Sequence, residues 1–376
     1  MDSLTRVINT IEFKKPDRFP IMHAILPAAW LKYGEKLHSS LTKYPTYLHV
    51  NENISNGFIA SAGYETSSEL IEKFPLSDDF VFVEPRTYQF GKICQTGYQS
   101  DEWGCIWGKK DPGIVGQVVK NPLSNFNIDK LKNILINYNF PDPNALWRYD
   151  TPLLEKQEKY SRATKKYFIA YIGNLFELLQ WLFGFENLFI YFYEKPKIIE
   201  DIIEKIVNYN IETMKNFSKY SINGVGMNDD WGTQESLMIK PEMWKRYFKP
   251  AYKKIIKEAK NRKLHFHFHT DGNTVDIIED LIEIGVDVIN PQLSCINLDK
   301  LSYLCKGRVC IRTDIDRQYL LPYGSTEEVR KYIIKIVDLF GIDNGGLIFC
   351  GEINSDAKLE NIEEMYKCFE EYGLTG

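Results

Sequence analysis

The stretch "LHFHFHTDGNTVDIIEDLIEIGVDVINPQ" (264–292) contains the signals of a strand, a helix and a second strand in direct succession. Residues 264–271 alternate between histidine and phenylalanine, the period of an extended chain. Residues 274–285 carry apolar side chains at helical spacing, and a second apolar run follows at 286–292. Strand, helix and strand in this order predict two parallel strands joined by a right-handed crossover.

The same alternation extends over the rest of the chain. Apolar runs that end in polar, Gly or Asp residues predict eight strands, at 18–25, 46–52, 167–173, 224–231, 264–271, 286–292, 308–315 and 346–352. Helical stretches separate the later ones, so we expect an α/β protein built as one (β/α)8 barrel. Residues 80–108 are predicted to form an inserted β-hairpin. The chain shows no repeat or low-complexity linker, which favours a single domain over residues 1–376.

The composition narrows the class of protein. The 376 residues are 44% hydrophobic and 14% aromatic, enough for a large core. The net charge of −5, from 46 basic and 51 acidic residues without long single-sign blocks, argues against a nucleic-acid partner. No apolar run approaches the ~18 residues of a membrane span, so no membrane partner is expected.

The cysteines and the N-terminal sequence indicate where the protein works. Seven cysteines lie far apart without a CxxC pair, and the first 20 residues contain no apolar signal core. We therefore expect a cytoplasmic protein whose cysteines are reduced thiols.

A barrel of this kind carries its active site at the carboxyl ends of its strands, and polar residues gather there in the sequence. One predicted strand ends in "NDDWGTQ" (228–234), another in "NPQ" (290–292) and a third in "RTDIDRQ" (312–318). His265, His267 and His269 project from one face of an extended segment, because their spacing is i, i+2, i+4.

Several ordered motifs from about residue 170 onward resemble the uroporphyrinogen decarboxylase superfamily, and most closely its corrinoid-linked methyltransferase branch. The stretches that carry the resemblance are "GNLFELLQWLFGFEN" (173–187), "DDWGTQESLMIKPEMWKRYFKP" (229–250), "HTDGNTVDIIEDLIEIGVDVINPQ" (269–292), "TDIDRQYLLPYGSTEEV" (313–329) and "CGEINSDAKLENIEEMY" (350–366). This resemblance implies the same barrel fold.

The resemblance also implies a zinc site. In the methyltransferase branch a His-x-Cys-Gly motif and a later Cys-Gly motif hold a catalytic zinc; His269 and Cys350 match, but Asp271 stands in place of the middle cysteine. A carboxylate is also a monoanionic zinc ligand, although oxygen is harder than sulfur and leaves the metal more Lewis acidic. We therefore expect zinc at His269, Asp271 and Cys350.

The function that follows is methyl or similar alkyl transfer between a methylated corrinoid on a partner protein and a small-molecule acceptor, a thiol or a pterin-type carrier. The residues expected to act in catalysis or as partners of the metal ligands are Asp230, His267 and Glu352. The residues expected to bind substrate are Gln234, Asn290, Gln292, Asp314 and Asp316.

Two alternatives remain. One is a metal-free lyase like the decarboxylase itself, acting on a tetrapyrrole or another carboxylated substrate. The decarboxylase binds its substrate carboxylates with an arginine-rich RQAGR segment. The corresponding residues 22–37 contain no arginine, so we rank this alternative second. The other is a non-catalytic module that docks a corrinoid or tetrapyrrole protein through its many aromatic side chains.

Overall fold

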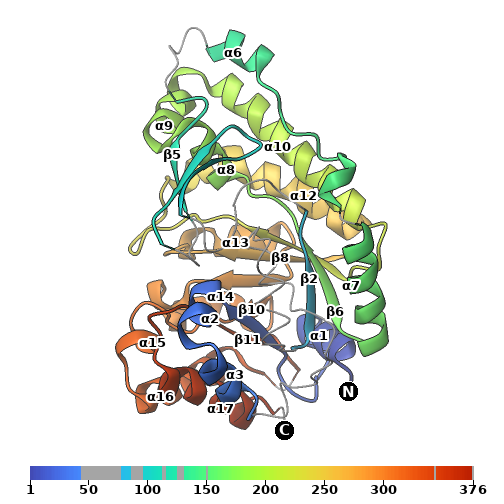
Figure 1. The fold of residues 1–376 in the computed structure, drawn as a ribbon, viewed down its shortest axis with the longest axis vertical. Coiled ribbons are helices and arrows are strands. Elements are labelled where there is room, and N and C mark those ends of the chain that lie inside the picture. Colours follow the sequence, from blue (N-terminus) through green and yellow to red (C-terminus); the bar gives the residue numbers. More distant parts are fainter. Residues whose placement is uncertain are drawn as a thin grey trace.

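The computed structural model describes residues 1–43, 78–85, 96–111, 116–124, 131–149, 151–342 and 344–374. Eight parallel strands form a nearly closed barrel in the order β1-β11-β10-β9-β8-β7-β6-β2, with helices between them (Figure 1). The barrel strands are β1 (Ile21–Ile25), β2 (Phe80–Val83), β6 (Tyr167–Tyr171), β7 (Gly224–Asn228), β8 (His265–Thr270), β9 (Val288–Pro291), β10 (Cys310–Arg312) and β11 (Leu347–Ile353). The predicted (β/α)8 barrel is confirmed.

The helices lie around and between these strands. Before β7 they are α1 (Ser3–Ile11), α2 (Pro27–Tyr33), α3 (Glu35–Leu41), α6 (Leu131–Asn137), η2 (Leu146–Arg148), α7 (Thr151–Thr164), α8 (Phe176–Phe183), α9 (Phe185–Glu194) and α10 (Pro196–Phe217). After β7 they are α11 (Pro241–Met243), η3 (Trp244–Phe248), α12 (Lys249–Asn261), α13 (Val275–Glu283), η4 (Leu293–Cys295), α14 (Leu298–Cys305), α15 (Leu320–Tyr323), α16 (Thr326–Phe340) and α17 (Leu359–Tyr372). No helix among the described residues is both long enough and apolar enough to span a membrane.

The two ends of the chain meet where the barrel closes. Strand β1 pairs in parallel with β11, with Met22 opposite Cys350. On its other side, the backbone N–H of Asp79, just before β2, donates to the carbonyl of Ile21 at 3.2 Å. Figure 1 accordingly shows the blue helices α2 and α3 beside the red helices α16 and α17.

Alternation along each strand divides the apolar side chains into two sets. One set packs between the strands and the outer helices, and a smaller set that includes Tyr167, Tyr171 and Ile348 fills the barrel interior. Strand β7 contributes glycine to the interior: a methyl group on Gly226 would lie 2.6 Å from the Tyr171 ring. The large aromatic rings of β6 therefore need the small residues of β7 as neighbours.

The structure corrects the predicted N-terminal third. The expected strand at 46–52 lies outside the described residues, and the stretch 80–83, assigned to the insertion, is the barrel strand β2 paired with β6. Periodicity did not separate these two apolar runs. The insertion itself is an antiparallel sheet of β3 (Gly97–Ser100), β4 (Ile106–Lys109) and β5 (Gln117–Lys120). The prediction of a single domain over residues 1–376 stays a prediction.

Candidate active site

The loops that follow β7 and β8 are joined backbone to backbone at the barrel mouth. The N–H of Gly232 donates to the carbonyl of Asp271 at 3.0 Å, and the N–H of Asn273 donates to that of Thr233 at 2.7 Å. Gly272 has a φ of 80°, and a side chain there would meet the backbone of Gly232. Only glycine fits this crossing without strain, and the crossing holds the side chains that precede it close together.

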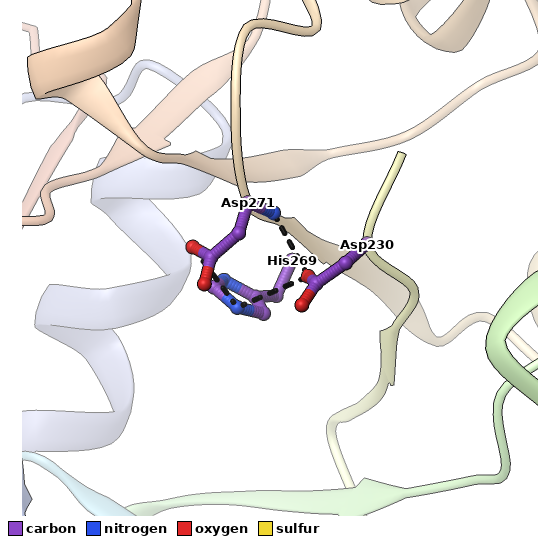
Figure 2. A group of neighbouring side chains, drawn as sticks. All are labelled: Asp230, His269 and Asp271. Atoms are coloured by element: carbon purple, nitrogen blue, oxygen red, sulfur yellow. Dashed lines mark hydrogen bonds and ion pairs between the residues drawn. The ribbon is translucent and has the colours of Figure 1, made fainter. Parts of the chain in front are cut away.

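Three of those side chains form a compact group (Figure 2). The Nε2 atom of His269 lies 3.8 Å from Oδ1 of Asp230 and 3.6 Å from Oδ1 of Asp271, and the three ligand atoms all lie within 4.8 Å of one another. The same Asp230 oxygen accepts a hydrogen bond from the backbone N–H of Asp271 at 2.9 Å. One nitrogen and two carboxylate oxygens at this separation could hold a metal ion.

The ring of His269 is held in the orientation that a metal ligand needs. Its Nδ1 lies 2.7 Å from Oδ1 of Asn290, whose own amide group donates to the carbonyls of Arg312 and Thr313 at 2.9 and 3.0 Å. Those two bonds fix Oδ1 as the atom that faces His269, so Nδ1 carries the proton and donates. The other ring nitrogen, Nε2, then faces Asp230 and Asp271, which is the arrangement of metal-bound histidines with a hydrogen-bonded second nitrogen.

An arginine from the loop after β10 ties several carboxylates together. Arg317 donates to Oδ2 of Asp314 at 2.7 Å, forms a short ion pair with Oδ2 of Asp271, and has its Nε 3.3 Å from Oε1 of Glu352. The remaining oxygen of Asp271, Oδ1, is buried and has no hydrogen-bond partner among the described residues. This is the oxygen that faces His269, so an acceptor is left for a cation.

Burial disfavours the ionised form of the acidic groups at the mouth of the barrel. It raises the pKa of Asp314 to about 7, although the Arg317 guanidinium opposes the shift. Burial also raises the pKa of Asp230 and of Glu352, and the charge on nearby Asp271 adds to both shifts. A carboxyl group that is held back from ionising in this way gains most from a bound cation.

Two acidic residues that meet at the start of α8, Glu177 from the helix itself and Asp229 from the loop after β7, complete the surroundings. The carboxylate of Asp229 accepts from the backbone N–H groups of Leu175, Phe176 and Glu177 at 2.8–3.0 Å, and so caps α8 from a distance. Burial raises the pKa of Glu177 well above its usual range, and the charges of Asp230 and Asp229 raise it further. Consecutive aspartates thus have different tasks: Asp229 holds the helix, and Asp230 faces the site.

Two predicted residues lie in the barrel interior, below the group at the mouth. His267 is buried one pleat below His269, where its Nε2 lies 3.1 Å from the Tyr167 hydroxyl, and burial lowers its pKa well below the usual range. Cys350 is buried one pleat below Glu352 in the interior cluster, and burial raises the pKa of its thiol to about 12. Within the described part of the chain, the metal-sized group contains Asp230 rather than Cys350. Coordination by Cys350 and catalysis by His267 stay predictions.

The other residues expected to bind substrate differ in their positions. Gln292 is buried beside the mouth; its Oε1 accepts from the N–H of Gly272 at 2.8 Å, and its Nε2 has no partner among the described residues. Gln234 lies at the exposed rim and donates to Gln318 at 3.1 Å. Asp316 accepts from the N–H groups of the two residues beginning at Gln318, at 2.9 Å each, and so closes a turn rather than joining the carboxylates of the mouth. Contact of these residues with a substrate stays a prediction.

Sequence reasoning missed Arg317 and Glu177 as site residues. Arg317 belongs to the quoted motif "RTDIDRQ" (312–318). The signal that could have identified it is a positive charge directly after two aspartates. Glu177 reaches the site from the start of a helix, where strand alternation gives no information about direction.

Comparison with known proteins places the chain in a family. The family model described as "Uroporphyrinogen decarboxylase (URO-D)" matches residues 157–372, more than half of the 376 residues. The chain belongs to the uroporphyrinogen decarboxylase family, as its motifs predicted. No curated protein matches it.

Solved structures share the fold. A methyltransferase from Methanosarcina mazei is similar over 99% of both chains, with a TM-score of 0.67 and 13% identity. A B12-independent methionine synthase from Shewanella sp. W3-18-1 matches 58% of this chain and 65% of its own, with a TM-score of 0.40 and 11% identity. At these identities the first likeness establishes the barrel fold over the whole chain, and the second carries no further weight.

Proposed function

We propose that this protein is a zinc-dependent methyltransferase whose metal ligands are Asp230, His269 and Asp271. The observation that carries the proposal is the set of three ligand atoms within 4.8 Å of one another at the carboxyl end of the barrel. Family membership and the fold shared with a methyltransferase support this choice of chemistry.

The residues fit a zinc ion for two reasons. The Nε2 lone pair of His269 and the unpartnered Oδ1 of Asp271 face the same point as Oδ1 of Asp230. The hydrogen bond from His269 to Asn290 supplies the outer support that metal-bound histidines usually have. Zinc held there would lower the pKa of a thiol, so that a thiolate nucleophile exists at neutral pH.

The reaction we propose moves a methyl group from a corrinoid carried by a partner protein to a small thiol or pterin-type acceptor. With a thiol, the sulfur would release its proton to water and form a bond to the methyl carbon, and the corrinoid would keep the electron pair of the bond that it loses to carbon. Within the chain, Asn290 orients His269, and Gln292 offers its unpartnered Nε2–H to a polar group of the acceptor. Glu352 and Asp314 hold Arg317 beside the reacting groups.

Decarboxylation of a porphyrinogen is not supported by the same mouth. The rim presents the carboxylates of Asp230, Asp271, Asp314 and Glu352 with Arg317 among them, and residues 22–37 supply no arginine. Many substrate carboxylates would meet like charges there without compensating cations.

The test combines metal content with turnover. Protein purified without added metal is analysed for zinc, then incubated anaerobically with methylcobalamin and 2-mercaptoethanol. We expect about one zinc per chain and formation of the methyl thioether, which the metal-depleted protein forms at a much lower rate. Metal-free protein that makes no thioether but releases carbon dioxide from uroporphyrinogen would contradict the proposal.

A further inference from the structure

Arg317 is in close contact with the group that we assign to the metal. Its guanidinium is mostly buried, with 17% of the side chain exposed, and its three nitrogens face Asp314, Asp271 and Glu352. Each of the three carboxylates comes from the end of a different barrel strand, so the arginine crosses the mouth from β10 towards β8 and β11. A buried guanidinium with three carboxyl partners offsets the mutual repulsion of the acidic groups around it.

Asp271 is shared between this arginine and the metal-sized group. Its Oδ2 pairs with Arg317, while its Oδ1 lies 3.6 Å from Nε2 of His269. A divalent ion bound to Oδ1 would lie on the same carboxylate as the guanidinium. Two cations bound to the two oxygens of one carboxylate repel each other, and the repulsion is stronger in a partly buried site than in water. The guanidinium also reduces the negative charge on Asp271 that is available to the metal.

We propose that Arg317 is a built-in competitor of the metal. This inference rests on the proposed metal site and adds a mechanism that sets the affinity of that site. Without metal, Arg317 neutralises Asp271 and keeps the acidic mouth together. When the ion binds, the charge of Arg317 is carried by Asp314 and Glu352, which already contact its Nη1 and Nε. The site therefore holds zinc more weakly than its ligands alone would.

The decisive variant is Arg317→Gln, which removes the charge and keeps a hydrogen-bond donor. Arg317→Lys keeps the charge and controls for the loss of shape. The matched control is Arg308→Gln, because Arg308 lies before β10, at the opposite end of the strand from Arg317, and forms its own two-pronged pair with Glu279 at 2.7 and 2.9 Å.

Zinc affinity of each apo protein is measured by titration against a chromophoric chelator, with circular dichroism to confirm folding. We expect Arg317→Gln to bind zinc about tenfold or more tightly than wild type, and Arg317→Lys and Arg308→Gln to match wild type. Thermal unfolding gives a second measure: zinc should raise the melting temperature of Arg317→Gln more than that of wild type.

The outcomes separate this inference from the proposed function. If wild type binds zinc and Arg317→Gln binds it equally or more weakly, the inference is wrong and the metal site stands. If only Arg317→Gln binds zinc, Arg317 excludes the metal from the wild-type site. This result supports the inference and contradicts the proposed metal dependence. If neither protein binds zinc, both are wrong. An Arg317→Gln protein that folds only with zinc supports the inference.

Discussion

Histidines at the mouth and in the interior of the barrel lie on one strand, β8, but have different surroundings. At the mouth, His269 faces two carboxylates and has its ring orientation fixed by Asn290. His267, one pleat inward, and His265, two pleats inward, share the Tyr167 hydroxyl at 3.1 Å each, and burial lowers the pKa of both rings. His267 is enclosed in the barrel interior, whereas Nε2 of His265 lies 3.3 Å from Oε1 of Glu12 at the opposite end of the strand.

The difference shows that residue type alone does not make a site. Three histidines at equal spacing share one face of β8, but they occupy its opening, its middle and its carboxyl end, and His269 is the one beside the carboxylates at the mouth. In the middle, His267 packs against the Tyr167 ring and contacts its hydroxyl, while its buried Nδ1 has no hydrogen-bond partner among the described residues. At the mouth, buried acidic groups create a demand for a cation.

The largest effect is expected from removing the imidazole at the mouth. His269→Ala should weaken zinc binding by about 100-fold or more, because one of three protein ligands is lost. His265→Ala, on the same face of the same strand, should bind zinc as wild type does. Competition with a chelator measures both affinities. Equal losses in the two variants would abolish the distinction between mouth and interior.

A smaller effect should separate the two candidates for the remaining ligand. Asp230→Asn keeps the acceptor for the Asp271 N–H but loses the negative charge, so zinc affinity should fall about tenfold. Cys350→Ala removes a buried thiol one pleat below the rim and should change the affinity less than about threefold. The opposite order would show that the coordination shell extends into the interior and includes Cys350, as the sequence resemblance implied.

The last effect concerns Glu84, the acidic residue that directly follows β2. Burial raises the pKa of Glu84 to about 8, well above the value of an unfolded chain. Between about pH 5 and 8 the folded protein thus keeps a proton that the unfolded chain releases, and stability falls as the pH rises. Glu84→Gln removes this loss, so its stability advantage over wild type should grow by at least about 1–2 kcal/mol between pH 5 and pH 8. Urea unfolding at pH 5 and 8 measures the difference; an equal advantage at both values would contradict the shifted pKa.

Much of the barrel could be predicted because strand alternation and helical spacing are properties of the local sequence. The Ser-Thr-Glu-Glu sequence at 325–328 is typical of a helix start, and α16 begins there with reciprocal capping bonds between Ser325 and Glu328. Strand β2 was misassigned because "FVFV" at 80–83 and the run at 46–52 are both short and apolar, and periodicity does not distinguish a barrel strand from an insertion.

The site could be predicted only in part, for a geometric reason. Asp230, His269 and Asp271 lie at the carboxyl ends of two adjacent strands, so the order of the strands in the sequence is enough to bring them to one rim. Alternation also puts Cys350 and Glu352 on one face, but it does not tell which of them reaches the mouth. Arg317 and Glu177 arrive from a loop and from a helix start, whose directions depend on tertiary packing.

X-ray absorption spectroscopy at the zinc edge tests the central claim most directly. In wild-type protein loaded with one equivalent of zinc and no thiol, we expect a first shell of nitrogen and oxygen at about 2.0–2.2 Å, from His269, Asp230 and Asp271. A sulfur scatterer at about 2.3 Å, or the absence of a site that retains zinc, would contradict the account.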